Sequence, residues 1–108
     1  MQAVLKALAE PRRVAILKLV AGRELPAGEI ARRFKTSRPA ISQHLRVLTD
    51  AGLLAQRRVG TLRLYRARPE TMAELRGFLD AFWDDGLAAL KREAENEARS
   101  KGRPRGRR

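Results

Sequence analysis

Residues 37–54 carry the signals for the start, the body and the end of one helix. Ser37 is a residue type that caps a first turn, and Pro39 is tolerated there because its missing N–H has no partner inside the helix. Gly52 suits the left-handed conformation that closes a helix. One face is apolar at helical spacing, with Ile41, Leu45 and Leu48. We therefore predict a helix from about residue 38 whose apolar face belongs in a core.

The opposite face of this helix is polar and carries no bulky side chain. Gln43 can pair with adenine and Arg46 with guanine, while Ser42 can bond a base edge or a phosphate, as recognition in the DNA major groove requires. His44 lies beside the apolar face, which favours packing or a phosphate contact over base reading. The alternative for the whole face is an ordinary solvated surface.

The formal net charge of +12 is unevenly distributed along the chain. Residues 1–68 contain 15 Lys and Arg against 4 acidic residues, whereas residues 69–98 contain 3 against 8. The basic part favours a polyanionic partner, either nucleic acid or an anionic membrane surface. No apolar run approaches the length of a membrane span and no signal peptide is apparent, so we expect a cytoplasmic protein with no membrane partner.

Three further helices are predicted before residue 37, at residues 2–8, 11–21 and 26–34. The first two are separated at Glu10 because the residue before a proline avoids the helical region. Only residues 35 and 36 lie between the third helix and Ser37. A helix, a short turn and a second helix form the supersecondary unit of many DNA-binding proteins.

After Gly52 the pattern changes from helical to alternating, which predicts strands at residues 54–58 and 62–66 and a turn at 59–61. Arginines recur along both strands. A basic hairpin directly after a recognition helix is typical of the wing of a winged helix, which lies over phosphates or a minor groove. Edge strands also carry charge to resist pairing with other chains, and the same arginines can serve both purposes.

Residues 69–98 are predicted to form one long helix with an apolar, aromatic-rich stripe. Such a stripe outside a compact core more often packs against a partner helix, and the first helix of the chain can complete that surface. Packing within the single chain is the alternative. The predicted dimer interface comprises Val4, Leu5, Leu8, Leu75, Leu79, Phe82, Trp83 and Leu87.

Residues 99–108 contain six basic residues and no acidic ones, so we predict a domain at residues 1–98 followed by a disordered basic tail. The tail is interpreted as a phosphate-binding arm, with a segment that only increases solubility as the alternative. Arg105-Gly106-Arg107 resembles the core of an AT-hook, which lies in a narrow A·T minor groove, although Arg108 replaces the usual proline.

The order of these elements resembles that of the ArsR/SmtB family of bacterial transcriptional repressors over residues 1–98. The motifs that carry the resemblance are LAEPRRVAIL at 8–17, EIA at 29–31, SRPAISQHLRVL at 37–48, AGLL at 51–54 and the hairpin at 57–65. The resemblance implies a mainly α winged helix-turn-helix with a small β-hairpin. It also implies a homodimer that uses its first and last helices as the interface and represses transcription at a palindromic operator in double-stranded DNA.

Residues from the recognition helix and the hairpin make up the predicted DNA-binding set. They are Ser37, Arg38, Pro39, Ser42, Gln43, His44, Arg46, Arg57, Arg58 and Arg63.

The sequence departs from the metal-sensing members of that family. Their sites use cysteines near the start of the third helix, or histidine and carboxylates on the last helix. This chain has no cysteine, and its one histidine is on the recognition helix. Asp80 and Asp84 share a helix face, which is more often a solvated surface than a cation site. We therefore expect no metal and no cofactor.

An enzyme is a poor fit, because the chain has no nucleophile–base set, no Gly-rich phosphate loop and no metal motif. Two alternatives to a repressor remain. One is a winged-helix module that binds another protein, and the other is an architectural DNA-binding protein without operator preference.

Overall fold

The computed structural model describes residues 1–101, and contacts divide the chain into two units. The first unit is Met1–Leu75, and the second begins at Arg76. Within the described residues, no helix is long and apolar enough to cross a membrane. The predicted tail lies outside the described residues from position 102 onward.

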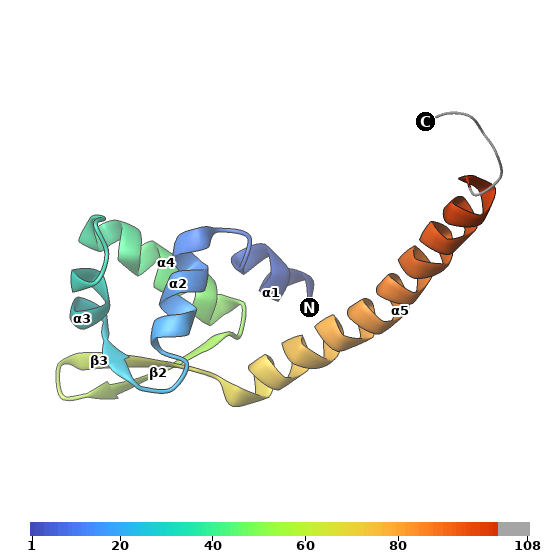
Figure 1. Cartoon of the computed structure of the whole chain (residues 1–108). Coiled ribbons are helices and arrows are strands. Elements are labelled where there is room, and N and C mark those ends of the chain that lie inside the picture. Colours follow the sequence, from blue (N-terminus) through green and yellow to red (C-terminus); the bar gives the residue numbers. More distant parts are fainter. Residues whose placement is uncertain (102–108) are drawn as a thin grey trace. The chain divides into compact units, whose positions relative to one another are not determined.

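The chain is mainly helical with a small antiparallel sheet, as predicted (Figure 1). The elements in chain order are α1 (Gln2–Ala7), α2 (Pro11–Leu19), β1 (Leu25–Pro26), α3 (Ala27–Arg32), α4 (Arg38–Asp50), β2 (Leu54–Val59), β3 (Leu62–Ala67) and α5 (Pro69–Lys101). Helix α3 is shorter at both ends than the predicted helix at residues 26–34, because Pro26 belongs to a strand and residues 33–36 form the turn.

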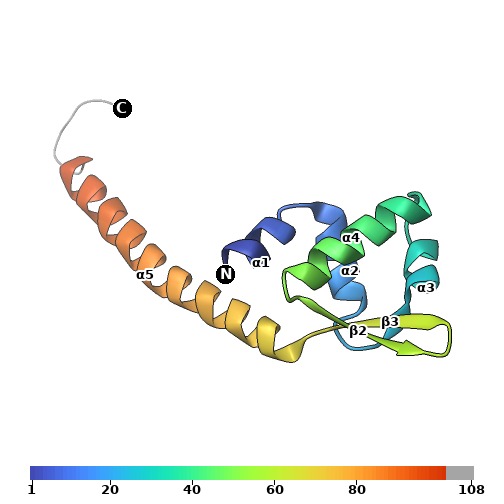
Figure 2. The ribbon, with the colours of Figure 1, turned by 180° about the vertical axis from the view of Figure 1, so that it is seen from behind.

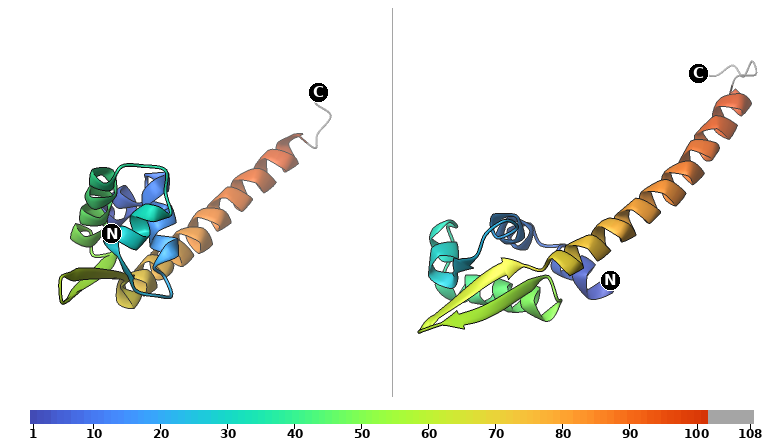
Figure 3. Two further views of the ribbon diagram at one scale, coloured as in Figure 1. Left: turned by 90° about the vertical axis from the view of Figure 1, so that its left-hand side faces the viewer. Right: turned by 90° about the horizontal axis from the view of Figure 1, so that it is seen from below.

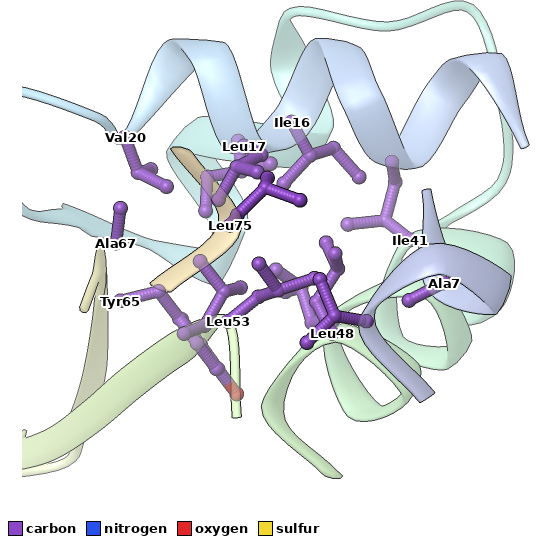
Figure 4. Close-up of a cluster of buried hydrophobic side chains, with 14 residues drawn as sticks. Ala7, Ile16, Leu17, Val20, Ile41, Leu48, Leu53, Tyr65, Ala67 and Leu75 are labelled. Carbon is purple, nitrogen blue, oxygen red and sulfur yellow. The ribbon is translucent and has the colours of Figure 1, made fainter. Parts of the chain in front are cut away.

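A single hydrophobic cluster lies beneath the inner face of α4 (Figure 4). Ile41, Leu45 and Leu48 are at most 1% exposed, which confirms the predicted apolar face of this helix. The remaining buried members come from other helices, strands and connections of the first unit: Val4, Ala7, Ile16, Leu17, Val20, Ile30, Leu53, Leu54, Tyr65, Ala67 and Leu75. Because its inner face is buried at three successive turns, α4 cannot rotate, and its outer face has a fixed orientation.

The sheet contains a strand that the sequence pattern did not predict. The strand order is β1-β3-β2, with Leu25 opposite Tyr65 and Pro26 opposite Leu64. A strand of two residues is too short to show an alternating pattern, and a proline such as Pro26 is also typical of the start of a helix. The predicted hairpin is present, and Gly60 in its turn has a φ of +62°, a conformation that favours glycine.

Hydrogen bonds join the end of α4 to the start of α5. Gly52 adopts a φ of +83°, as predicted for the residue that closes the helix. The Thr71 hydroxyl donates to the Gly52 carbonyl oxygen at 2.6 Å, and the Arg68 N–H donates to the Leu53 carbonyl oxygen at 3.0 Å. The first turn of α5 is therefore fixed to the residues that end α4.

Helix α5 continues through Lys101, so the boundary predicted at residue 98 falls inside the helix. Past Leu75 its large apolar side chains are exposed on the chain, and the exposed fraction is 59% for Phe82 and 60% for Trp83. The residues from 91 to 99 carry no large apolar side chain. The apolar stripe of α5 therefore ends at Leu90.

Candidate nucleic-acid interface

Helices α3 and α4 form a helix-turn-helix unit that α2 holds in place. The Glu10 carboxylate caps α2 by accepting from the N–H groups of Arg12 at 2.8 Å and Arg13 at 3.2 Å. The Arg12 side chain donates to the Lys35 carbonyl oxygen at 3.4 Å, in the turn between α3 and α4. The Arg13 side chain donates to the Ala7 carbonyl oxygen at 2.6 Å, where α1 ends. These bonds connect α1, α2 and the turn that leads into α4.

The first turn of α4 is capped as the sequence predicted. The Ser37 hydroxyl accepts from the Ala40 N–H at 3.2 Å, and Pro39 lies in the first turn. The cap satisfies one of the amides that has no partner inside the helix, which fixes the start of α4.

The outer face of α4 presents donors and acceptors to solvent. Ser42, Gln43 and Arg46 are all exposed, and so are Arg38 and Pro39 at the start of the helix. Among the described residues, neither arginine has a hydrogen-bond or ion-pair partner. Both cations are therefore available to a ligand.

A cleft of about 460 Å³ separates the outer face of α4 from the hairpin. Its lining comes from β1, the start of α3, α4 and the hairpin: Pro26, Ala27, Gly28, Arg38, Ser42, Arg46, Thr49, Asp50, Gln56, Thr61, Leu62, Arg63 and Tyr65. Figures 2 and 3 show the hairpin running along α4 in the first unit. Three arginines against one aspartate make the cleft basic, so it suits a phosphate backbone.

The hairpin holds two of its arginines directly opposite each other. Arg58 on β2 pairs with Arg63 on β3, and both are exposed. Like charges at directly opposite positions destabilise a sheet. An anion bound between them would remove that repulsion, which is the electrostatic arrangement expected at a phosphate contact.

Arg57 has a different environment, because it is paired with Glu24. Its guanidinium donates to the Glu24 carboxylate at 2.7 and 2.9 Å. This hydrogen bond holds the pKa of Glu24 below its usual range and raises that of Arg57, so both groups are charged at neutral pH. Sequence reasoning missed Glu24, since the two residues are 33 positions apart and only the sheet brings them together.

His44 faces α2 and does not line the cleft. Its side chain is 16% exposed, with Nε2 4.0 Å from a Glu10 carboxylate oxygen and Nδ1 3.5 Å from a guanidinium nitrogen of Arg13. Of the two roles predicted for this residue, its surroundings favour packing. Among residues 1–101 there is no group of three potential metal ligands.

The predicted dimer residues divide into buried and exposed groups. Val4 and Leu75 are buried in the core of the first unit, and Leu8 packs against it. The remaining ones are exposed on the chain: Leu5, Leu79, Phe82, Trp83 and Leu87. Two exposed residues of α5, Phe78 and Leu90, were not in the predicted set.

Comparison with known proteins places these features in a family. Residues 10–56 match the family described as bacterial regulatory protein, arsR family. The chain is 42% identical over 92 residues to the HTH-type transcriptional regulator Rv2034 of Mycobacterium tuberculosis, covering 85% of this chain and 86% of the relative. The chain belongs to the arsR family.

Other relatives extend this assignment of the arsR-family chain. It is 40% identical over 65 residues to the transcriptional repressor SdpR of Bacillus subtilis, covering 60% of this chain and 72% of the relative. Among solved structures, it resembles the homodimeric winged helix-turn-helix DNA-binding domain of Mb0332 from Mycobacterium bovis. The TM-score is 0.64 at 35% identity, over 80% of each chain.

This arsR-family chain is therefore a DNA-binding transcriptional regulator with a winged helix-turn-helix fold. The predicted fold class and function class are confirmed. Its relatives are described as transcription regulators, in agreement with the prediction that the chain is not an enzyme.

The cap of α4 can be tested separately from its outer face. Ser37→Ala is expected to lower the free energy of unfolding by about 1 kcal/mol, because the Ala40 N–H loses its acceptor. Ser42→Ala is the matched control, since it removes the same hydroxyl from an exposed position inside the helix, where alanine is the better helix former. Urea unfolding followed by circular dichroism measures both, and equal losses would contradict the capping role.

Proposed function

We propose that this regulator is a homodimeric repressor that places two copies of α4 in the major groove of an imperfectly palindromic operator. The observation that carries the proposal is the surface of α4, where a capped helix with a buried inner face presents Ser42, Gln43 and Arg46 outward. A relative described as a transcriptional repressor and a solved relative described as homodimeric support the two parts of the proposal.

In this proposal the three outward residues of α4 read base edges, and their neighbours position the helix. Gln43 pairs with adenine and Arg46 with guanine, while Ser42 bonds a base edge or a phosphate. Ser37, Arg38 and Pro39 lie where the start of α4 meets the phosphate backbone, and the helix N-terminus adds favourable partial charge there. Arg58 and Arg63 bind phosphates beside the groove.

We assign the dimer interface to the exposed stripe of α5, with Leu5 of α1 contributing. The stripe runs from Phe78 to Leu90 and consists of side chains that are between 41% and 65% exposed on the chain. Exposed aromatic and leucine side chains in one continuous strip are characteristic of an interface that a second subunit covers.

We further propose that metal ions do not release this repressor, because the chain has no cysteine and only one histidine. A zinc site needs three or four converging ligands, mostly Cys, His or carboxylates, and residues 1–101 contain no group of three such residues that could hold a metal ion. As a regulator of bacterial transcription, the protein would act in the cytoplasm, on the chromosome.

The proposal is tested with a duplex from the region upstream of the protein's own gene and a random duplex of equal length. We expect preferential binding to the first, two chains per duplex, and a footprint with half-sites about 10 base pairs apart or a multiple of that spacing. Transcription from that promoter in vitro is expected to fall when the protein is added.

Three outcomes would contradict the proposal. Equal affinity for both duplexes would indicate an architectural DNA-binding protein. Binding to neither would indicate a module for protein interaction. Increased transcription would indicate an activator.

A further inference from the structure

The ion pair between Glu24 and Arg57 spans the whole width of the sheet. Glu24 directly precedes β1 at one edge, and Arg57 is on β2 at the other edge. Both strands pair with β3 between them, where Pro26 and Arg57 are each opposite Leu64. The carboxylate therefore reaches over β3 to a guanidinium two strands away, and two hydrogen bonds fix that geometry.

The pairing register separates the arginines of the hairpin into two faces. Alternate residues point to opposite faces and directly opposite residues share one, so Arg58 and Arg63 share a face with Gln56 and Tyr65. Gln56, Tyr65 and Arg63 line the cleft beside α4, and Pro26 and Leu62 of the opposite face contribute at its edges. Arg57 is on the other face.

The two faces differ in charge balance. The face of Arg57 also carries Arg66, and Arg66 is close enough to Glu24 to help lower the pKa of its carboxyl. Arg58 and Arg63 have no ion-pair partner within residues 1–101. The acidic group is therefore paired with the face of Arg57, opposite to the face that carries Arg58 and Arg63.

We propose that Glu24 determines specificity by occupying Arg57 and confining the phosphate contacts of the wing to Arg58 and Arg63. Each arginine that neutralises a phosphate adds affinity that is independent of sequence. A free Arg57 would raise affinity for all DNA and lower the ratio between operator and random sites. The inference rests on the proposed role of the hairpin in DNA binding, and it removes Arg57 from the DNA-contact set predicted from the sequence.

The test measures how steeply affinity for a random duplex falls with salt, using the full chain. Glu24→Gln is expected to steepen the slope of log affinity against log salt by about 0.9 per chain, since one more phosphate is neutralised. Between about 50 and about 200 mM salt, the loss of affinity then becomes roughly 3.5-fold larger per chain. Arg57→Gln alone is expected to leave the slope unchanged. The double variant Glu24→Gln/Arg57→Gln is expected to restore the original slope.

Glu74→Gln is the matched control, because it removes the same charge from an exposed carboxylate that has no ion-pair partner in the described chain. If Glu24→Gln and Glu74→Gln steepen the slope equally, only net charge is acting and the inference is overturned. A reduced slope for Arg57→Gln alone would also overturn it, since Arg57 would then already bind a phosphate. Circular dichroism verifies that each variant is folded.

The failure of the proposed function has a different signature. Arg58→Gln and Arg63→Gln are each expected to reduce the slope by about 0.9 per chain. If both leave the slope unchanged, the phosphate contacts assigned to this face are wrong. The variants at Glu24 and Arg57 still show whether the Glu24 carboxylate prevents Arg57 from binding a phosphate.

Discussion

Leu79→Glu is expected to convert the protein from a dimer into monomers. Leu79 lies within the exposed stripe of α5, where its side chain is 46% exposed on the chain. Burying a leucine contributes about 1.5 to 3 kcal/mol, and a two-fold dimer loses that contribution twice. Because Leu79 is already about half covered on the chain, each copy loses about half of that contribution, so the dissociation constant of the dimer should rise at least about tenfold, before the cost of burying a carboxylate is added. Sedimentation velocity over a range of concentrations measures the change.

Ala88→Glu is the matched control for this experiment. Residue 88 is exposed and, at 3.6 residues per turn, lies on the side of α5 opposite Leu79. Ala88→Glu introduces the same charge as Leu79→Glu and should leave the dimer intact. A Leu79→Glu protein that still sediments as a dimer would refute the assigned interface. A monomer should also lose most of its affinity for a two-half-site operator, because the second half-site no longer binds in the same complex.

Gln43→Ala and Arg46→Ala are expected to remove recognition of particular base pairs. Each residue is exposed on the outer face of α4, and a bidentate contact to a base contributes about 1 to 3 kcal/mol of discrimination. Two half-sites double the loss for a dimer, to about 2 to 6 kcal/mol in operator binding. The measurement is a competition series in which each operator base pair is replaced in turn.

The loss of discrimination is expected at particular base pairs only. The Arg46→Ala variant should no longer distinguish one guanine in each half-site from other bases. Arg63→Ala should instead weaken binding to every duplex by a similar factor. Arg76→Ala, which removes an exposed arginine paired with Asp80 on α5, controls for net charge. If neither Gln43→Ala nor Arg46→Ala changes the preference at any position, these side chains do not read bases.

The structure agrees best with the sequence where the signals are local. The start of α4 at Ser37, its buried face and its stop at Gly52 all follow from residues close together in the chain, and each is present. The hairpin was predictable for the same reason, since alternation and a turn glycine are short-range patterns.

Features that depend on distant residues could not be predicted in this way. The surroundings of His44 are set by Arg13 on α2 and by Glu10, which caps that helix, and the state of Arg57 is set by Glu24. Leu75 and Leu79 belong to the same apolar face in the helical pattern, yet the first is buried within the chain and the second is exposed. Periodicity identifies an apolar face but does not say what covers it.

The junction between Gly52 and Thr71 has a consequence for regulation. The hydrogen bonds there fix the end of α4, whose outer face is proposed to read bases, to the first turn of α5. The first turn of α5 therefore cannot move independently of the end of α4. In the proposed dimer, a signal that displaces the first turn of α5 would displace the end of α4 with it and so alter the separation of the two copies of α4. Binding of the dimer to an operator with fixed half-site spacing would then change, although the signal does not contact the DNA.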